Sequence, residues 1–139
     1  MSATRRSLPI LILTVLLCTV AFSGVIRDGS LTASSNGTDI TIRWVSEDET
    51  GVIRYELERK AGAGQSGQFI LLDPVQLKGN NSSYEYIDNS AFRAMESVYQ
   101  YRIKVLFTGG TSVYYGPITV THSVNSVRRT WGSIKAMFR

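Results

Sequence analysis

The sequence predicts an all-β fold, a seven-stranded antiparallel β-sandwich in which no convincing helix interrupts the body of the chain. The clearest observation is the run 98–107, Val-Tyr-Gln-Tyr-Arg-Ile-Lys-Val-Leu-Phe, where apolar and polar side chains alternate. Only an extended strand places every second residue on the same face. One face is apolar and aromatic and the other is cationic, as in an antiparallel sheet with one side in water. Similar short runs, separated by turn residues about every 8–12 positions, complete the pattern of a sandwich.

Seven such runs follow one another along the chain. Asn36-Gly37 favours a tight hairpin turn after the first run, and the glycines of residues 61–67 favour a flexible loop after the third. Pro117 lies in the last run, and because proline cannot donate to a ladder, that strand should be an edge or contain a bulge. The expected strands are residues 30–34, 38–46, 52–60, 69–72, 84–86, 98–107 and 112–121.

The alternation also assigns residues to the core. In the run 52–60 we expect Ile53, Tyr55 and Leu57 to point inward, and the charged residues between them to point outward. Most aromatic residues fall at inward positions, so core packing explains them better than ligand binding does. The other expected inward residues are Ile40, Ile42, Trp44, Tyr84, Tyr86, Tyr99 and Tyr101.

Residues 1–23 are expected to be a cleaved signal peptide, with residues 24–122 as the folded domain. Arg5 and Arg6 form a positive n-region, an apolar stretch of h-region length follows, and small residues precede the expected cleavage after Ser23. This predicts a secreted or extracytoplasmic protein, in the periplasm or at the cell surface. An uncleaved membrane anchor is the alternative, but the apolar stretch is shorter than the roughly 20 residues that a spanning helix needs.

The charge of the chain is concentrated at its ends. The sequence has 15 basic and 11 acidic residues; two of the basic residues lie in the leader and four lie in residues 123–139, so residues 24–122 carry 9 basic against 11 acidic, or −2. The basic pI is therefore not a property of the domain, and a nucleic-acid partner is not expected. The only cysteine, Cys18, lies in the leader, so the mature chain would have no disulfide and no thiolate metal site.

The order and spacing of several motifs resemble a fibronectin type III domain, an immunoglobulin-like sandwich, over residues 29–121. The resemblance implies that Tyr99 is the corner tyrosine, with its hydroxyl bonded back to the backbone of the preceding connection. The proline-rich first strand of that family is poorly matched, and its Arg-Gly-Asp adhesion loop is absent from the turn Thr108-Gly109-Gly110-Thr111. The motifs are Ile40-Thr41-Ile42-Arg43-Trp44, Tyr55-Glu56-Leu57-Glu58-Arg59, Tyr86-Ile87-Asp88, Tyr99-Gln100-Tyr101-Arg102-Ile103-Lys104-Val105 and Gly110-Thr111-Ser112-Val113-Tyr114-Tyr115-Gly116-Pro117-Ile118.

Nothing in the sequence predicts an enzyme, a cofactor or a metal site. His122 is the only histidine, and we expect it to be exposed at the end of the last strand, with no nucleophile and carboxylate spaced as a triad requires. Glu47, Asp48 and Glu49 could attract Ca²⁺, but they lack the alternating spacing of a calcium loop and are expected to form a solvated acidic turn.

Two adjacent tyrosines are the best surface candidates in the domain. Because Tyr114 and Tyr115 are neighbours in a strand, one of them must face outward, beside the Gly-Gly turn. An exposed tyrosine there would suit contact with a partner or a sugar.

Residues 123–139 form a basic, amphipathic tail. The apolar residues Val127, Trp131, Ile134 and Phe138 recur at the spacing of one helical face. The tail could fold back on the sandwich, dock on a partner or on an anionic membrane surface, or act as a sorting or attachment signal. Its candidate binding residues are Arg128, Arg129, Trp131, Ile134, Lys135, Phe138 and Arg139.

These observations together predict an exported, non-catalytic interaction or structural module of the fibronectin type III kind, docked, tethered or sorted by its tail. The expected partner is a protein or a cell-surface component, which could be a glycan. The alternative is a small carbohydrate- or surface-binding protein that uses loop tyrosines. A secreted hydrolase is a third class, which the missing catalytic set disfavours, and the sequence leaves the oligomeric state open.

Overall fold

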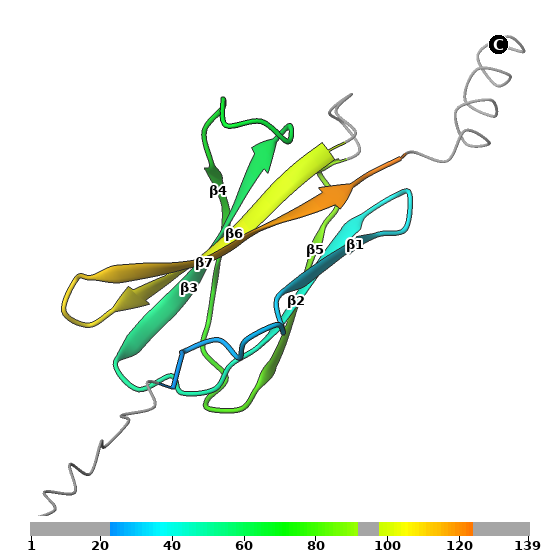
Figure 1. Cartoon of the computed structure of the whole chain (residues 1–139). Helices are drawn as coiled ribbons and strands as arrows, with labels where there is room; N and C mark the ends of the chain where they lie inside the picture. The colour runs from blue at the N-terminus through cyan, green and yellow to red at the C-terminus, as the bar shows by residue number, and fades with distance from the viewer. Residues whose placement is uncertain (1–22, 92–97, 124–139) are drawn as a thin grey trace, which may run out of the picture.

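A computed structural model of the chain describes residues 23–91 and 98–123 and confirms the predicted all-β sandwich of seven antiparallel strands (Figure 1). The expected leader, apart from its last residue, and residues 124–139 of the tail lie outside the described residues. Within the described ranges, no helix has the length and apolar character needed to cross a membrane.

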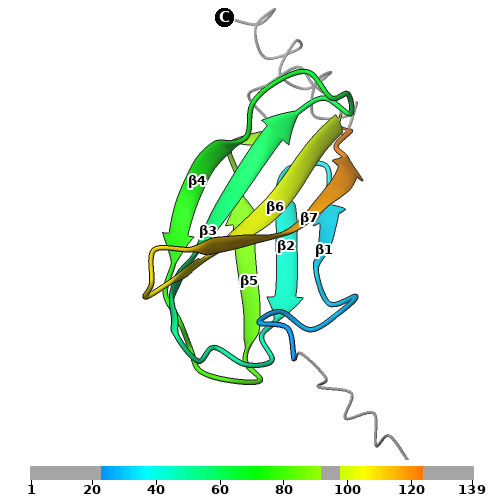
Figure 2. The ribbon, with the colours of Figure 1, turned by 60° about the vertical axis from the view of Figure 1, so that its left-hand side comes forward.

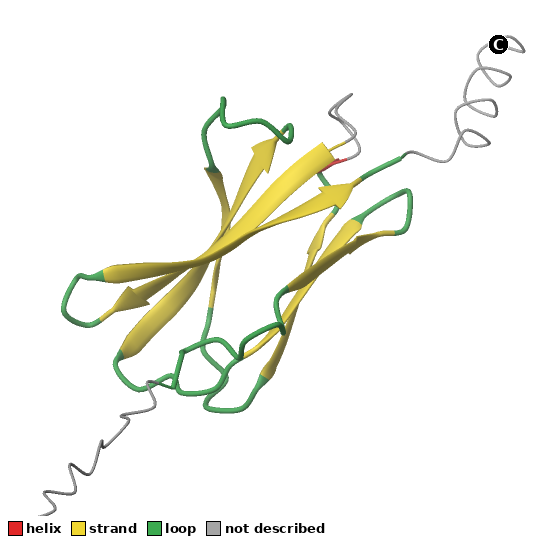
Figure 3. Cartoon of the chain, in the orientation of Figure 1, coloured by secondary structure: helices red, strands yellow, loops and turns green. Residues whose placement is uncertain are grey.

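The strands form two sheets that pack face to face (Figures 1 and 2). The three-stranded sheet has the order β1-β2-β5, and the four-stranded sheet has the order β4-β3-β6-β7. Short loops and turns join the strands at the two ends of the sandwich (Figure 3). The strand bounds are β1 Thr32–Ser35, β2 Ile40–Val45, β3 Val52–Ala61, β4 Ile70–Val75, β5 Ser83–Asp88, β6 Val98–Phe107 and β7 Ser112–Thr121.

Aromatic side chains fill the core between the sheets, as the alternation predicts. Trp44 of β2 stacks on Tyr84 of β5, with ring centroids 5.0 Å apart and an interplanar angle of 3°. Tyr55 of β3 meets both rings edge-on, with its ring centroid 5.8 Å from that of Trp44 and 5.2 Å from that of Tyr84. Tyr99 and Tyr101 of β6 are fully buried, while Tyr86, also expected inward, is only partly buried. Offset and edge-on ring pairs of this kind add to the stability that burial alone provides.

The prediction for the start of β3 is wrong at one residue. Ile53, expected in the core, is exposed, and Val52 is buried in its place. The pairing of β3 with β6 shifts register between Val52 and Arg54, so one extra residue enters the strand there. Such a bulge reverses the alternation of side chains, which resumes as predicted from Tyr55 onward.

The prediction that the strand of Pro117 is an edge or contains a bulge is confirmed, because both features are present. Strand β7 is an edge of the four-stranded sheet, and its pairing with β6 shifts register between Tyr101 and Ile103, opposite Gly116-Pro117. Gly116 has φ +101°, and a Cβ on it would lie 3.0 Å from the Tyr101 carbonyl oxygen. A residue with a side chain would therefore force the two strands apart at this point.

Strand β4 is longer than expected and begins one residue later. The sequence predicts residues 69–72, whereas the strand spans Ile70–Val75 and includes Pro74. Because β4 is the other edge of its sheet, a proline that cannot donate is tolerated there. Phe69 is left just outside the strand, at the end of the β3–β4 loop.

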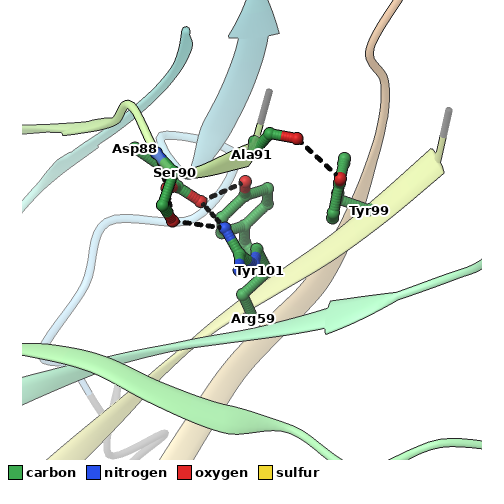
Figure 4. A network of polar contacts seen from close by, with 6 residues as sticks. All are labelled: Arg59, Asp88, Ser90, Ala91, Tyr99 and Tyr101. Atoms are coloured by element: carbon green, nitrogen blue, oxygen red, sulfur yellow. Dashed lines mark hydrogen bonds and ion pairs between the residues drawn. The ribbon is translucent and has the colours of Figure 1, made fainter. Parts of the chain in front are cut away.

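A buried carboxylate network closes one end of the sandwich (Figure 4). Asp88, at the end of β5, accepts hydrogen bonds from Arg59 Nη1 at 2.6 Å and from the Tyr101 hydroxyl at 2.8 Å. Its other oxygen accepts from the Ser90 amide and hydroxyl. Beside it, the Tyr99 hydroxyl donates to the Ala91 carbonyl oxygen at 2.8 Å, the backbone contact expected of a corner tyrosine.

A second buried carboxylate closes the opposite end of β5, and it corrects the expectation of a solvated acidic turn. Glu49 is buried and accepts hydrogen bonds from the hydroxyls of Tyr55 and Tyr84 and from the Gly79 amide. Burial and the bond to Glu49 raise the pKa of Tyr84 to about 12. Glu49 therefore anchors the β2–β3 and β4–β5 loops to the core.

Candidate interaction surface

The most organised group of charged and aromatic side chains outside the core lies on the side of the four-stranded sheet that faces away from the core. We call this side the outer face. Two of its charged members, Glu56 and Lys60, are themselves buried. Alternation along β3 and β6 places charged residues there, since their neighbours Tyr55, Leu57, Tyr101 and Ile103 fill the core. The outer face includes Phe69, Leu71, Tyr114 and the charged residues Arg54, Glu56, Glu58, Lys60, Arg102 and Lys104.

Arg102 lies at the centre of this face, between two aromatic rings. Its Cζ is 4.0 Å from the ring centroid of Phe69 and 4.2 Å from that of Tyr114. Its Nε pairs with Glu58 Oε2 at 2.5 Å, and Glu58 is its direct cross-strand partner in the register of β3 and β6. Two ring contacts and one ion pair together hold the guanidinium in a single place. We call Phe69, Arg102, Tyr114 and Glu58 the Arg102 clamp.

A second ion-pair group lies next to the clamp. Glu56 pairs with Arg54 at 2.6 Å through one oxygen and with Lys104 at 3.0 Å through the other. Hydrogen bonds from Arg54 and Lys104 outweigh the effect of burial and hold the pKa of Glu56 below its usual value. Both carboxylates of the outer face are therefore already engaged by cations of the same sheet.

The β3–β4 loop folds over the sheet and places Phe69. Lys60 Nζ donates to the Gly64 carbonyl oxygen at 2.6 Å, and Gln100 Nε2 donates to the Ala63 carbonyl oxygen at 3.0 Å. Lys60 Nζ also lies 5.3 Å from the Phe69 ring centroid. The two hydrogen bonds tether the glycine-rich loop, which the sequence predicts to be flexible, at Ala63 and Gly64, and the cation–ring contact lies at Phe69.

Apolar surface borders the clamp. Leu71 pairs with Glu58 in the register of β3 and β4, so it shares the outer face, and the residue is 54% exposed. Tyr114 is 47% exposed. Aromatic residues and arginine are the residue types most enriched at the centres of protein interfaces. The outer face therefore combines exposed apolar surface with an arginine, which suits non-covalent binding of a partner.

The structure separates the two tyrosines that the sequence singles out. Tyr114 is exposed on the outer face, whereas Tyr115 is partly buried, packs against the core, and accepts a hydrogen bond from the Val25 amide at 2.9 Å. Tyr115 therefore holds the chain at Val25, before the first strand, against the sandwich. The tail candidates lie outside the described residues: Arg128, Arg129, Trp131, Ile134, Lys135, Phe138 and Arg139.

Sequence reasoning missed Arg102, Phe69 and Glu58 as a group. The alternation of 98–107 gives the signal for a cationic face, but it does not show which residues from other strands meet that face. Phe69 is 33 positions from Arg102 in the sequence, and only the pairing of β3 with both β4 and β6 brings the two together.

The expectation that His122 is exposed is wrong. His122 is buried, its ring lies 6.3 Å from that of Tyr99, and its Nδ1 is 2.7 Å from the Ser35 hydroxyl. Ser35 Oγ also accepts from the Gly37 amide, so this pair ties the end of β1 to the end of β7. Among residues 23–91 and 98–123, no group of three histidine, cysteine or acidic residues could hold a metal ion.

No protein-family model matches the chain, and no curated protein matches it either.

Proposed function

We propose that the chain is an exported, non-catalytic interaction module with a fibronectin type III-like sandwich, and that it binds a protein or cell-surface partner through the outer face. One observation carries this proposal: Arg102 is held between Phe69 and Tyr114 by contacts that leave the group partly exposed. A side chain already fixed in its binding conformation loses little entropy when a partner docks.

Photo-crosslinking in the native host tests the surface with a matched control. Leu71 on the outer face and Ile87 on the three-stranded sheet are both 54% exposed. A photoreactive amino acid in place of Leu71 should give a discrete adduct, and the same residue in place of Ile87 should give none. Equal adducts at the two positions, or an adduct at Ile87 alone, would refute the outer face as the binding surface.

Export and the tail need separate experiments. The exported protein should begin at Gly24 on N-terminal sequencing; a chain that keeps its first 23 residues would support the anchor. A chain ending at His122 tests the tail. If that chain is as stable and as correctly localised as the full chain, the tail neither docks on the domain or a partner nor sorts the protein.

The second candidate function is sugar binding through Tyr114. Its support is the exposure of the Tyr114 ring beside polar side chains of the outer face. Binding on a glycan array that is lost on Tyr114→Ala and kept on Tyr115→Phe would favour it. Arg102 already lies over the Tyr114 ring, so a sugar would have to stack on the remaining face.

A further inference from the structure

We infer that the Arg102 clamp recognises a carboxylate, carried by an acidic segment of a partner protein. The inference rests on the proposed function, because it names the chemistry of the partner that would dock on the outer face. It follows from three features of the clamp: its free donors, its charge and its apolar border.

The first feature is the part of Arg102 that stays available. Nε is engaged by Glu58, and the guanidinium lies over two rings, which approach it from the β4 side and from the β7 side of the sheet. Neither Nη atom has a hydrogen-bond partner in the described part of the chain, and the side chain is 28% exposed. The group therefore offers a planar pair of N–H donors. That fork matches the two oxygens of a carboxylate.

The second feature is charge. The outer face carries four basic residues against two acidic ones, whereas the rest of the described chain carries four basic against eight acidic. Its two carboxylates, Glu56 and Glu58, each already form an ion pair with a cation of the same sheet, so the outer face presents no unpaired carboxylate to a cationic partner. An anionic partner gains from Arg102 and Lys104 and is steered away from the acidic remainder of the domain.

The third feature separates a peptide from a free anion. Leu71 and Tyr114 expose apolar surface beside the clamp. A segment in which acidic and apolar residues alternate would cover both the donors and this surface, which a small anion would leave in water. The apolar border therefore favours a protein segment of that composition over a free anion.

Titration of the isotope-labelled full chain with model peptides tests this inference. The probe is a capped Leu-Glu-Leu-Glu-Leu peptide, and its control is the same peptide with glutamine in place of glutamate. The Arg102 Nε–H signal and the amides of residues 102–104 and 114 should shift saturably with the acidic peptide. Binding of the glutamine peptide should be at least about tenfold weaker, since a charged pair is lost. Equal affinity for the two peptides would overturn the inference.

Two arginine variants provide a matched comparison. Arg43 also pairs through Nε with a cross-strand glutamate, Glu85 at 2.7 Å, but it lies on the three-stranded sheet, where no aromatic ring of the described residues contacts it. Arg102→Lys keeps the charge and removes the fork, so the acidic peptide should bind at least about tenfold more weakly. Arg43→Lys should leave binding unchanged. Undiminished binding by Arg102→Lys, or an equal loss in Arg43→Lys, would overturn the inference.

Sulfate titration and the crosslinking variants distinguish a general anion site and a different binding surface from the inferred peptide site. Inorganic sulfate that shifts the same signals at the same concentration as the peptide would identify a general anion site and overturn the peptide assignment. If Leu71 crosslinks to a partner and Arg102→Lys leaves that adduct intact, the outer face is the binding surface but the carboxylate assignment is wrong. If the peptide binds as expected while Leu71 and Ile87 crosslink equally, the Arg102 clamp binds a carboxylate, but the proposal that the native partner docks on the outer face is wrong.

Discussion

Replacing Asp88 with asparagine should be one of the most destabilising single changes in the sandwich. Asp88 is 2% exposed, and both of its oxygens accept hydrogen bonds: one from Ser90, the other from Arg59 and Tyr101 (Figure 4). Asparagine has the same shape but only one acceptor oxygen. Whichever way its amide turns, the NH₂ group faces a donor.

The structure sets the size of the effect. Removing one partner of a buried ion pair costs about 3–5 kcal/mol, because the remaining charge is left without compensation. Arg59 keeps a little contact with water, at 14% exposed, so we expect the lower end of that range, about 3 kcal/mol. Adding Arg59→Met removes the orphaned cation, and the double variant should be less destabilised than the sum of the two single changes.

Denaturant unfolding at pH 7, followed by fluorescence and circular dichroism, measures this loss. A change below about 0.5 kcal/mol, the usual range of a neutral surface substitution, would refute the reasoning. So would strict additivity in the double variant.

Acid unfolding provides an independent check on Asp88. Burial alone would raise the pKa of its carboxyl, but hydrogen bonds from Ser90, Tyr101 and Arg59 outweigh burial and lower it. A carboxyl with a lowered pKa stabilises the fold fully above its unfolded pKa of about 3.9, and this contribution is lost as the pH falls toward the folded value. The free energy of unfolding of Asp88→Asn should therefore fall less steeply below about pH 4 than that of the wild type. Equal slopes would contradict the assignment.

Three other substitutions test separate parts of the fold by the same unfolding assay. Tyr99→Phe removes the buried hydrogen bond to the Ala91 carbonyl oxygen and should cost about 1 kcal/mol or more. An unchanged free energy of unfolding would contradict the assignment of Tyr99 as a corner tyrosine. Gly116→Ala combines positive φ with a Cβ 3.0 Å from the Tyr101 carbonyl oxygen and should cost about 1–3 kcal/mol, whereas Gly109→Ala, with nothing within 4 Å, should cost much less. Glu49→Gln should cost about 2 kcal/mol, since a neutral amide replaces a carboxylate that accepts from two tyrosines and an amide; a neutral result would mean that the acidic turn is solvated after all.

The sequence was a good guide wherever a property depends on local alternation. A period of two along a strand follows from backbone geometry, so the inward positions of Trp44, Tyr55 and Tyr101 could be predicted without knowing their neighbours. The position of Pro117 was equally accessible, because the missing donor confines proline to an edge or a bulge whatever the partner strand is.

Local alternation failed where the ladder itself is irregular or where a side chain meets a distant loop. The bulge after Val52 moved Ile53 out of the core, and no residue in the strand signals that bulge. Glu49 looked like one of three equivalent acids, yet it alone reaches two tyrosine hydroxyls inside the sandwich. His122 is buried because the end of β7 runs beside β1.

By itself, the sequence determined the fold class, the number of strands and most of the core, since these depend on residue type and a period of two. Only the tertiary structure decided the candidate site. Phe69, Arg102 and Tyr114 come from a loop and two strands, and they meet because β3 and β6 pair at the centre of one sheet while β4 and β7 flank them. That assembly depends on long-range strand order and register, which no short stretch of the chain encodes.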